Sequence, residues 1–132
     1  MDYIADIIRC YEEDLQKVKN DGYTLRYVKE QTPELCLAAV KEAGAVLKLV
    51  NEQTPEICLA AVKNNGYALV FVKEQTYELC LAAVKEYGNT LQFVEEQTYE
   101  LCLESVKKHG YALQFVKDPL LKAQIKLELH YK

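Results

Sequence analysis

The sequence predicts an all-α protein: an α-solenoid of five short helical-hairpin repeats with a capping helix at each end. The first observation is that the string Glu-Gln-Thr recurs every 22 residues. It begins at Glu30, Glu52, Glu74 and Glu96. The second is that all five glycines occupy one position of this repeat, and that residues 32–53 match residues 54–75 at 14 of 22 positions. Since one such unit is too short to bury its own apolar face, neighbouring units are expected to stack into a continuous core.

The first helix of each unit has a clear beginning. Thr32 is a good N-cap, Pro33 suits the first helical position, and the carboxylate of Glu34 favours the positive end of the helix. Apolar residues then follow at helical spacing, which predicts a largely buried helix over 33–43. We expect Gly44 to end this helix in the left-handed conformation that glycine adopts readily.

A second, shorter helix is expected over about 45–52. Leu47, Leu49 and Val50 lie on one side of it, and the next threonine restarts the pattern. The two helices form a hairpin, and the hairpins extend over about residues 10–117. The whole chain, 1–132, is interpreted as one helical-repeat domain.

The two ends depart from the repeat, as end units do where no neighbour covers them. A longer N-terminal capping helix is predicted over about 2–20, and Glu13 and Asp14 replace apolar residues there. Its apolar residues are Ile4, Ile7, Ile8, Tyr11, Leu15 and Val18. A C-terminal capping helix is predicted over about 119–130, starting after Asp118. Polar ends of this kind argue against open-ended stacking.

Two phrases of the sequence resemble a known family. Thr32–Lys41 reads T-P-E-L-C-L-A-A-V-K, and Val62–Leu69 reads V-K-N-N-G-Y-A-L. They resemble a bacterial and giant-virus repeat family, the domain of unknown function 4116, over about residues 15–117. The resemblance implies a helical repeat array, often found in proteins of host-associated bacteria and their viruses, and it supplies no catalytic residues.

Composition narrows the classes of partner. The formal charge of −4 argues against nucleic acid as the default partner, and with 27% charged residues no apolar run is long enough to span a membrane. The first ten residues lack the apolar core of a secretory signal. An odd number of cysteines fits a reducing compartment. We therefore expect a cytoplasmic protein, or one delivered to a host cell without a recognisable signal.

Four of the five cysteines occupy one position in the apolar arc of the first helix. They are Cys36, Cys58, Cys80 and Cys102. Because each lies a full repeat from the next, they cannot converge on one metal ion, and packing is the favoured role. The only histidines, His109 and His130, have no plausible nucleophile beside them. We expect no catalytic residues, no metal and no cofactor.

Positions that vary from repeat to repeat are candidates for binding, because positions that build the core should recur. The first candidate strip flanks the glycines and consists of Asn65, Tyr67, Tyr87, Asn89, His109 and Tyr111. Tyrosine and asparagine suit a protein interface, although packing on the preceding helical turn is an alternative role for the tyrosines. The second candidate strip, which could equally be a solvated face, is the outer side of the second helix. It consists of Arg26, Lys48, Val70, Gln92 and Gln114, with Lys29, Asn51, Lys73, Glu95 and Lys117 beside them.

These features favour a non-enzymatic, monomeric protein–protein interaction module. The settings of the resembling family suggest a narrower version, a bacterial or phage-borne inhibitor or effector that binds a protein complex. An alternative is an array that binds RNA or single-stranded DNA through stacked tyrosines, although the repeated glutamates would repel phosphates. A structural part of a longer assembly is a third alternative.

Overall fold

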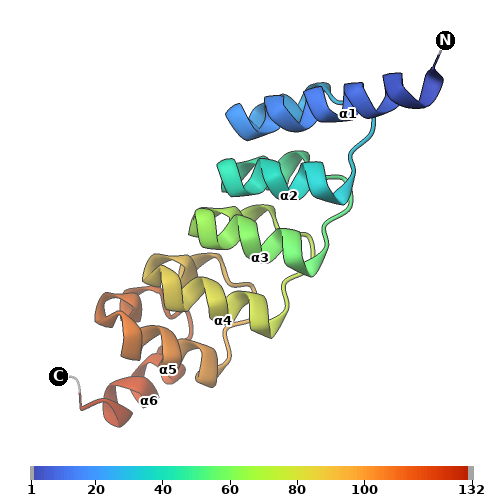
Figure 1. The fold of residues 1–132 in the computed structure, drawn as a ribbon. Helices are drawn as coiled ribbons and strands as arrows, with labels where there is room; N and C mark the ends of the chain where they lie inside the picture. The colour runs from blue at the N-terminus through green and yellow to red at the C-terminus, as the bar shows by residue number, and fades with distance from the viewer. Residues whose placement is uncertain (1, 131–132) are drawn as a thin grey trace.

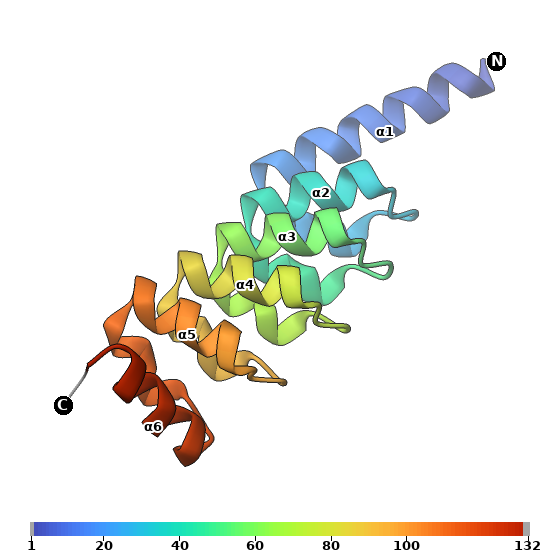
Figure 2. The same ribbon diagram turned by 90° about the horizontal axis from the view of Figure 1, so that it is seen from below.

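The computed structural model describes residues 2–130 and confirms the helical-repeat solenoid. The α-helices are α1 Tyr3–Asn20, α2 Pro33–Glu42, α3 Pro55–Asn64, α4 Tyr77–Glu86, α5 Tyr99–Lys108 and α6 Pro119–Glu128. Short 3₁₀ helices alternate with them: η1 Gly22–Tyr27, η2 Gly44–Leu49, η3 Gly66–Phe71, η4 Gly88–Phe93 and η5 Gly110–Phe115. The α-helices stack in chain order from one end of the molecule to the other (Figure 1), and the η helices form a second layer against them (Figure 2). No helix of this described part is long and apolar enough to cross a membrane.

The starts of the repeated α-helices follow the predicted capping. The Thr32 hydroxyl accepts a hydrogen bond from the Leu35 backbone N–H at 3.2 Å, and Pro33 occupies the first position of α2. Thr54, Thr76 and Thr98 make the same contact in α3, α4 and α5. One of the free N–H groups of each helix start is thereby satisfied.

The predicted left-handed glycines are wrong, because no described glycine has a positive φ. The glycines instead permit the next repeat to approach closely. A Cβ atom on Gly22 would lie 2.5 Å from the carbonyl oxygen of Ala39, and one on Gly88 would lie 2.5 Å from Cβ of His109. Each of these α-helices ends two residues before its glycine, and the residue between is extended, as at Ala43, whose φ is −146°. In the first four repeats, the close approach of the next repeat therefore requires glycine at this position.

The second helix of the unit also differs from the prediction. It is a 3₁₀ helix over Gly44–Leu49 and does not extend over 45–52. The Val50 N–H donates to the Leu47 carbonyl at 3.1 Å, and Val50 itself is already extended. The chain leaves the helix here because a side chain from the preceding repeat binds the backbone that follows.

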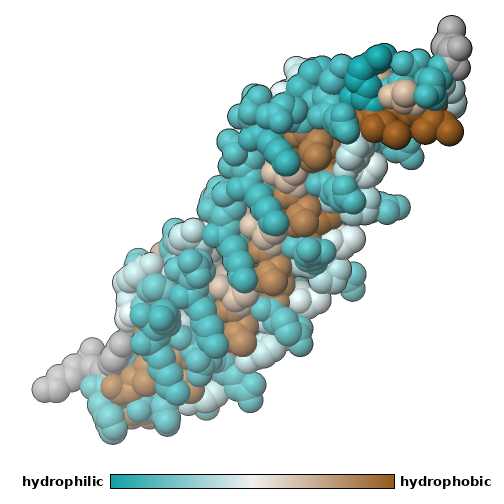
Figure 3. Space-filling view, viewed as in Figure 1, coloured by the Kyte–Doolittle hydropathy of each residue, from teal (hydrophilic) through white to brown (hydrophobic). Residues whose placement is uncertain are grey.

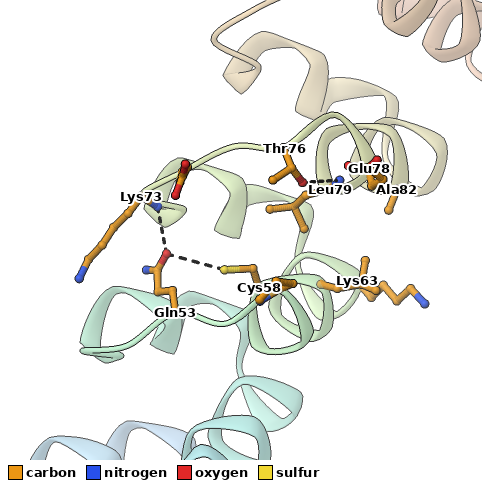
Figure 4. Close-up of a pocket in the computed structure, with 11 residues that line it drawn as sticks. Gln53, Cys58, Lys63, Lys73, Thr76, Glu78, Leu79 and Ala82 are labelled. Carbon is orange, nitrogen blue, oxygen red and sulfur yellow. Dashed lines mark hydrogen bonds between the residues drawn. The ribbon is translucent and has the colours of Figure 1, made fainter.

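That side chain is the glutamine of the Glu-Gln-Thr string. Gln31 Nε2 donates to the Leu49 carbonyl at 2.7 Å, and Gln31 Oε1 accepts from the Asn51 N–H at 2.9 Å. Gln53, Gln75 and Gln97 bind the following repeats in the same way. Figure 4 shows the Gln53 contact with the backbone of Lys73. The glutamines thus join each repeat to the next. We call the contact zone between neighbouring repeats the seam; it comprises these glutamines, the glycines and the side chains packed against the glycines.

The core lies between the two layers and runs through all repeats. In α2 the buried residues are Leu35, Cys36, Ala39 and Val40. The predicted packing role of the cysteines is confirmed, because Cys36, Cys58, Cys80 and Cys102 are all buried, whereas Cys10 is exposed. Each buried thiol lies 3.5 to 3.9 Å from the amide oxygen of the seam glutamine that precedes its helix.

The N-terminal end is less polar than predicted. Helix α1 is much longer than α2, so its first two turns project beyond the stack (Figure 2). Val18 is fully buried, but Ile4, Ile7 and Ile8 are exposed, together with Tyr3. Figure 3 shows hydrophobic residues gathered on this projecting part of α1. At the other end α6 starts at Pro119 after the capping Asp118, as predicted, but stops at Glu128, short of residue 130. It buries Ile125 against α5.

Candidate functional site

The first candidate strip consists of two rows with different surroundings. Asn65, Tyr87 and His109 precede their glycines, and we call them the pre-glycine row. Tyr67, Asn89 and Tyr111 follow their glycines, and we call them the post-glycine row. In the structure two members of the pre-glycine row reach back to the preceding repeat, whereas the post-glycine row is exposed.

The reaching residues of the pre-glycine row belong to the seam. The Tyr87 hydroxyl donates to the Lys63 carbonyl at 3.2 Å, and His109 Nε2 lies 3.0 Å from the Lys85 carbonyl. These are equivalent carbonyls in the last turns of α3 and α4, where the helix has no partner for them. Between α2 and α3 the equivalent carbonyl is that of Lys41, and it accepts a hydrogen bond from the Asn64 side-chain amide at 2.9 Å.

Different residues therefore satisfy one recurring backbone group. The variation that singled out Tyr87 and His109 has a structural explanation in the seam. Asn65 plays a local part, since its side chain accepts a hydrogen bond from the Tyr67 N–H at 3.0 Å and so caps η3. Asp21 caps η1 in the same way through the Tyr23 N–H.

The post-glycine tyrosines are exposed but are held by neighbouring rings. The exposed fractions of Tyr67 and Tyr111 are 53% and 54%. The Tyr67 ring meets the ring of Phe93 in the next repeat edge to face, with centroids 4.9 Å apart, and it also meets Phe71 at 6.4 Å. The Tyr111 ring is tilted against His109 at 5.7 Å. Contacts between rings orient aromatic side chains, so the edge-to-face pairs of Tyr67 and the tilted pair of Tyr111 present these tyrosines to solvent in defined orientations.

The second candidate strip joins the post-glycine row in one surface, which we call the η face. All five residues on the outer side of the η helices are exposed: Arg26, Lys48, Val70, Gln92 and Gln114. The Lys48 ammonium lies 5.9 Å from the Phe71 ring centroid, and Phe71 in turn contacts Tyr67. Two strips that the sequence separates are therefore connected through Phe71.

The η face has an unusual electrostatic character for this chain. The protein has 20 acidic residues, yet none lies within η1–η5. The residues beside the η helices, Lys29, Asn51, Lys73, Glu95 and Lys117, are exposed and only one of them is acidic. The acidic side chains are concentrated in the α-helices and in the loops before them. The η face combines aromatic rings with cations and is poor in carboxylates.

The opposite, α-helical side contains a hollow of about 560 Å³ between α3 and α4. Leu59, Leu79 and Ala82 line it, and lysine and glutamate side chains surround it (Figure 4). Cys58 contributes its thiol to the wall, where it bonds Gln53 (Figure 4). Burial raises the pKa of the Cys58 thiol, so it is neutral at physiological pH.

The other seam thiols behave alike. Burial raises the pKa of Cys36, and it raises that of Cys80 and Cys102 to about 11. Because the thiolate is the nucleophile and the metal ligand, these buried groups are chemically suited to packing. Sequence reasoning placed them correctly but missed the partner of each thiol, the seam glutamine.

Comparison with known proteins gives one result. The family described as "Domain of unknown function (DUF4116)" matches residues 54–98 and 76–122 in two overlapping segments. A search of curated proteins and a search of solved structures each found no match. The matched segments cover repeats from α3 through the start of α6 and include the η face from Tyr67 to Tyr111. With more than half of its length matched, the chain belongs to the DUF4116 family, as its repeated phrases indicate.

Proposed function

We propose that this protein is a non-enzymatic module that binds a protein partner through the η face. The observation that carries the proposal is the pair of exposed tyrosines, Tyr67 and Tyr111, held by neighbouring rings on a surface poor in carboxylates. Tyrosine contributes a large amphipathic contact area with little conformational freedom to lose, and it is enriched at the centres of protein interfaces.

The proposal narrows the surface that the sequence predicts. Tyr87 and His109 support the seam, so the partner is expected to contact Tyr67, Asn89 and Tyr111 together with Val70. Acting as a monomer in the reducing cytoplasm, the module is suited to inhibit or redirect a protein complex. The four buried cysteines and the one exposed cysteine, none paired in a disulfide, support the reducing compartment.

The test is affinity capture from a nuclease-treated lysate of the source organism, quantified by mass spectrometry. The parent chain is compared with a Tyr67→Ala, Tyr111→Ala variant. The matched control is Glu42→Ala, Glu86→Ala, which removes two exposed side chains on the α-helical side. Circular dichroism confirms that each variant is folded.

We expect proteins that the parent and the control retain to be lost by the tyrosine variant. The proposal is contradicted if the tyrosine variant retains the same proteins as the parent. It is also contradicted if the parent retains nothing that the beads alone do not.

A further inference from the structure

Two cations on the η face have no carboxylate partner. Neither Arg26 nor Lys48 has an acidic oxygen within 4.0 Å among the described residues. Aromatic rings orient them instead: the Lys48 ammonium lies 5.6 Å from the Tyr23 ring centroid, and the Arg26 guanidinium lies 6.0 Å from the same ring. A cation held over a ring face keeps hydrogen-bond donors available for an anion.

The cations that lie over aromatic rings are confined to one end of the η face. The outward position of the η helices holds Arg26 and Lys48 in the first two repeats, then the uncharged Val70, Gln92 and Gln114 in the last three. A polyanion such as RNA or DNA needs cations along its whole track, because phosphates recur at every nucleotide. The outward position supplies a cation in only two of five repeats, and the row beside it places Glu95 between Lys73 and Lys117. This surface therefore matches a short acidic element and not a continuous track of phosphates.

The neighbouring part of the η face is apolar. Val70 exposes 46% of its surface, close in the chain to the exposed Tyr67. Phe71 links the two parts, since it contacts the Tyr67 ring on one side and lies beside the Lys48 ammonium on the other. A ligand that reaches from Lys48 to Tyr67 therefore meets an anion-binding region and then an aromatic region.

We propose that the partner presents an acidic peptide segment, in which an aspartate or glutamate contacts Arg26 and Lys48 and an adjacent apolar side chain packs on Tyr67 and Val70. This inference rests on the proposed function, because it names the chemistry of the partner at the same surface. Opposite charges across such a contact speed association and fix the register of the segment more than they add affinity.

The test uses a library of random twelve-residue peptides displayed on phage and selected against the purified chain. Enriched peptides are then synthesised with a fluorescent label, and their dissociation constants are measured by anisotropy. Three variants are compared with the parent: Arg26→Glu with Lys48→Glu, Tyr67→Ala, and the control Lys41→Glu with Lys85→Glu. The control makes the same change of net charge at exposed lysines of the α-helical side. A labelled oligothymidylate is measured in parallel.

We expect enriched peptides to combine aspartate or glutamate with an apolar residue. Their affinity should fall about tenfold or more with Arg26→Glu, Lys48→Glu and with Tyr67→Ala, and should change less than twofold in the control. Peptides that need Tyr67 but lack acidic residues, or that bind the cation variant normally, overturn the acidic segment and leave the proposed function standing.

Two other outcomes bear on both proposals. Failure to enrich any peptide that depends on Tyr67 contradicts the acidic segment and the protein-binding surface together. Tighter binding of oligothymidylate than of any peptide, with the same dependence on Lys48 and Tyr67, replaces the peptide with a single-stranded nucleic acid.

Discussion

The seam and the η face use similar residues in different surroundings. Tyr87 lies in the seam, where its hydroxyl donates to the Lys63 carbonyl of the preceding repeat. Tyr111 lies on the η face, and its hydroxyl makes no hydrogen bond within residues 2–130. Gly22 is buried against the next repeat, whereas Gly110 is exposed. The placement of the neighbouring repeat, and not residue type or variation, therefore decides which positions are free to bind a partner.

The largest effect is expected at the seam glutamine. In the Gln53→Ala variant the Phe71 carbonyl loses its side-chain partner in a partly buried position, and the Lys73 N–H loses its partner at an exposed one. Leaving a buried backbone group unsatisfied costs about 1 to 3 kcal/mol, so we expect the free energy of unfolding to fall by about 2 to 3 kcal/mol. Urea unfolding followed by circular dichroism measures it.

The neighbouring Glu52→Ala variant is the control, because Glu52 is exposed in the same loop. Its free energy of unfolding should change by no more than about 0.5 kcal/mol. Equal effects at the two positions would show that the loop tolerates the loss of this contact and that the glutamine row does not hold the seam.

The glycines offer a comparison in which the sign of the effect differs. An alanine at position 22 places Cβ 2.5 Å from a backbone carbonyl, and overpacking of this kind is expected to destabilise the Gly22→Ala variant by about 2 kcal/mol. Gly110 is exposed and has no positive φ, so Gly110→Ala should be neutral or stabilise by up to about 1 kcal/mol. Thermal unfolding of each variant, compared with the parent, measures the two effects. Equal destabilisation by both substitutions would indicate a conformational need for glycine after all.

The sequence predicts the fold well because its signals are local. The threonine caps, the prolines and the apolar spacing act within one helix, and the period of 22 residues reports that the helices stack. The reason that glycine recurs at one position of the repeat is not local. It depends on the distance to the next repeat, which no single repeat contains, and the expected left-handed turn was therefore wrong.

The candidate site was harder to predict for the same reason. Gln31 and its equivalents recur without change, which marks them as structural, but their partners lie 18 and 20 residues away and depend on the path of the loop. Tyr87 and His109 vary, which favoured a binding role, yet they satisfy equivalent carbonyls of neighbouring repeats. The exposure of Tyr67 and Tyr111 follows from the tertiary structure alone.

A smaller effect separates the two tyrosines directly. Tyr87→Phe removes only the hydroxyl that donates to the Lys63 carbonyl, and the loss of one such bond should lower the free energy of unfolding by about 1 kcal/mol. Tyr111→Phe removes a hydroxyl in solvent and should leave stability unchanged. Urea titrations of both variants against the parent test this. A stability loss in Tyr111→Phe as large as that in Tyr87→Phe would mean that the η face also contributes to the stability of the fold.

The smallest effect on the free energy of unfolding concerns a buried position of the α-helices, and here we expect a substitution to stabilise the protein. Ser105 takes the place of Ala39, Ala61 and Ala83, is completely buried, and its hydroxyl has no hydrogen-bond partner among the described residues. A buried hydroxyl without a partner is unfavourable, although a helical serine can bond weakly to the carbonyl four residues earlier. We therefore expect Ser105→Ala to raise the free energy of unfolding by about 0.5 kcal/mol. The reciprocal Ala83→Ser variant should lower it by a similar or larger amount, because the position is equally buried. If Ser105→Ala instead destabilises the protein, the hydroxyl has a bonding role in solution, and the fifth repeat differs from the others in its seam as well as in its sequence.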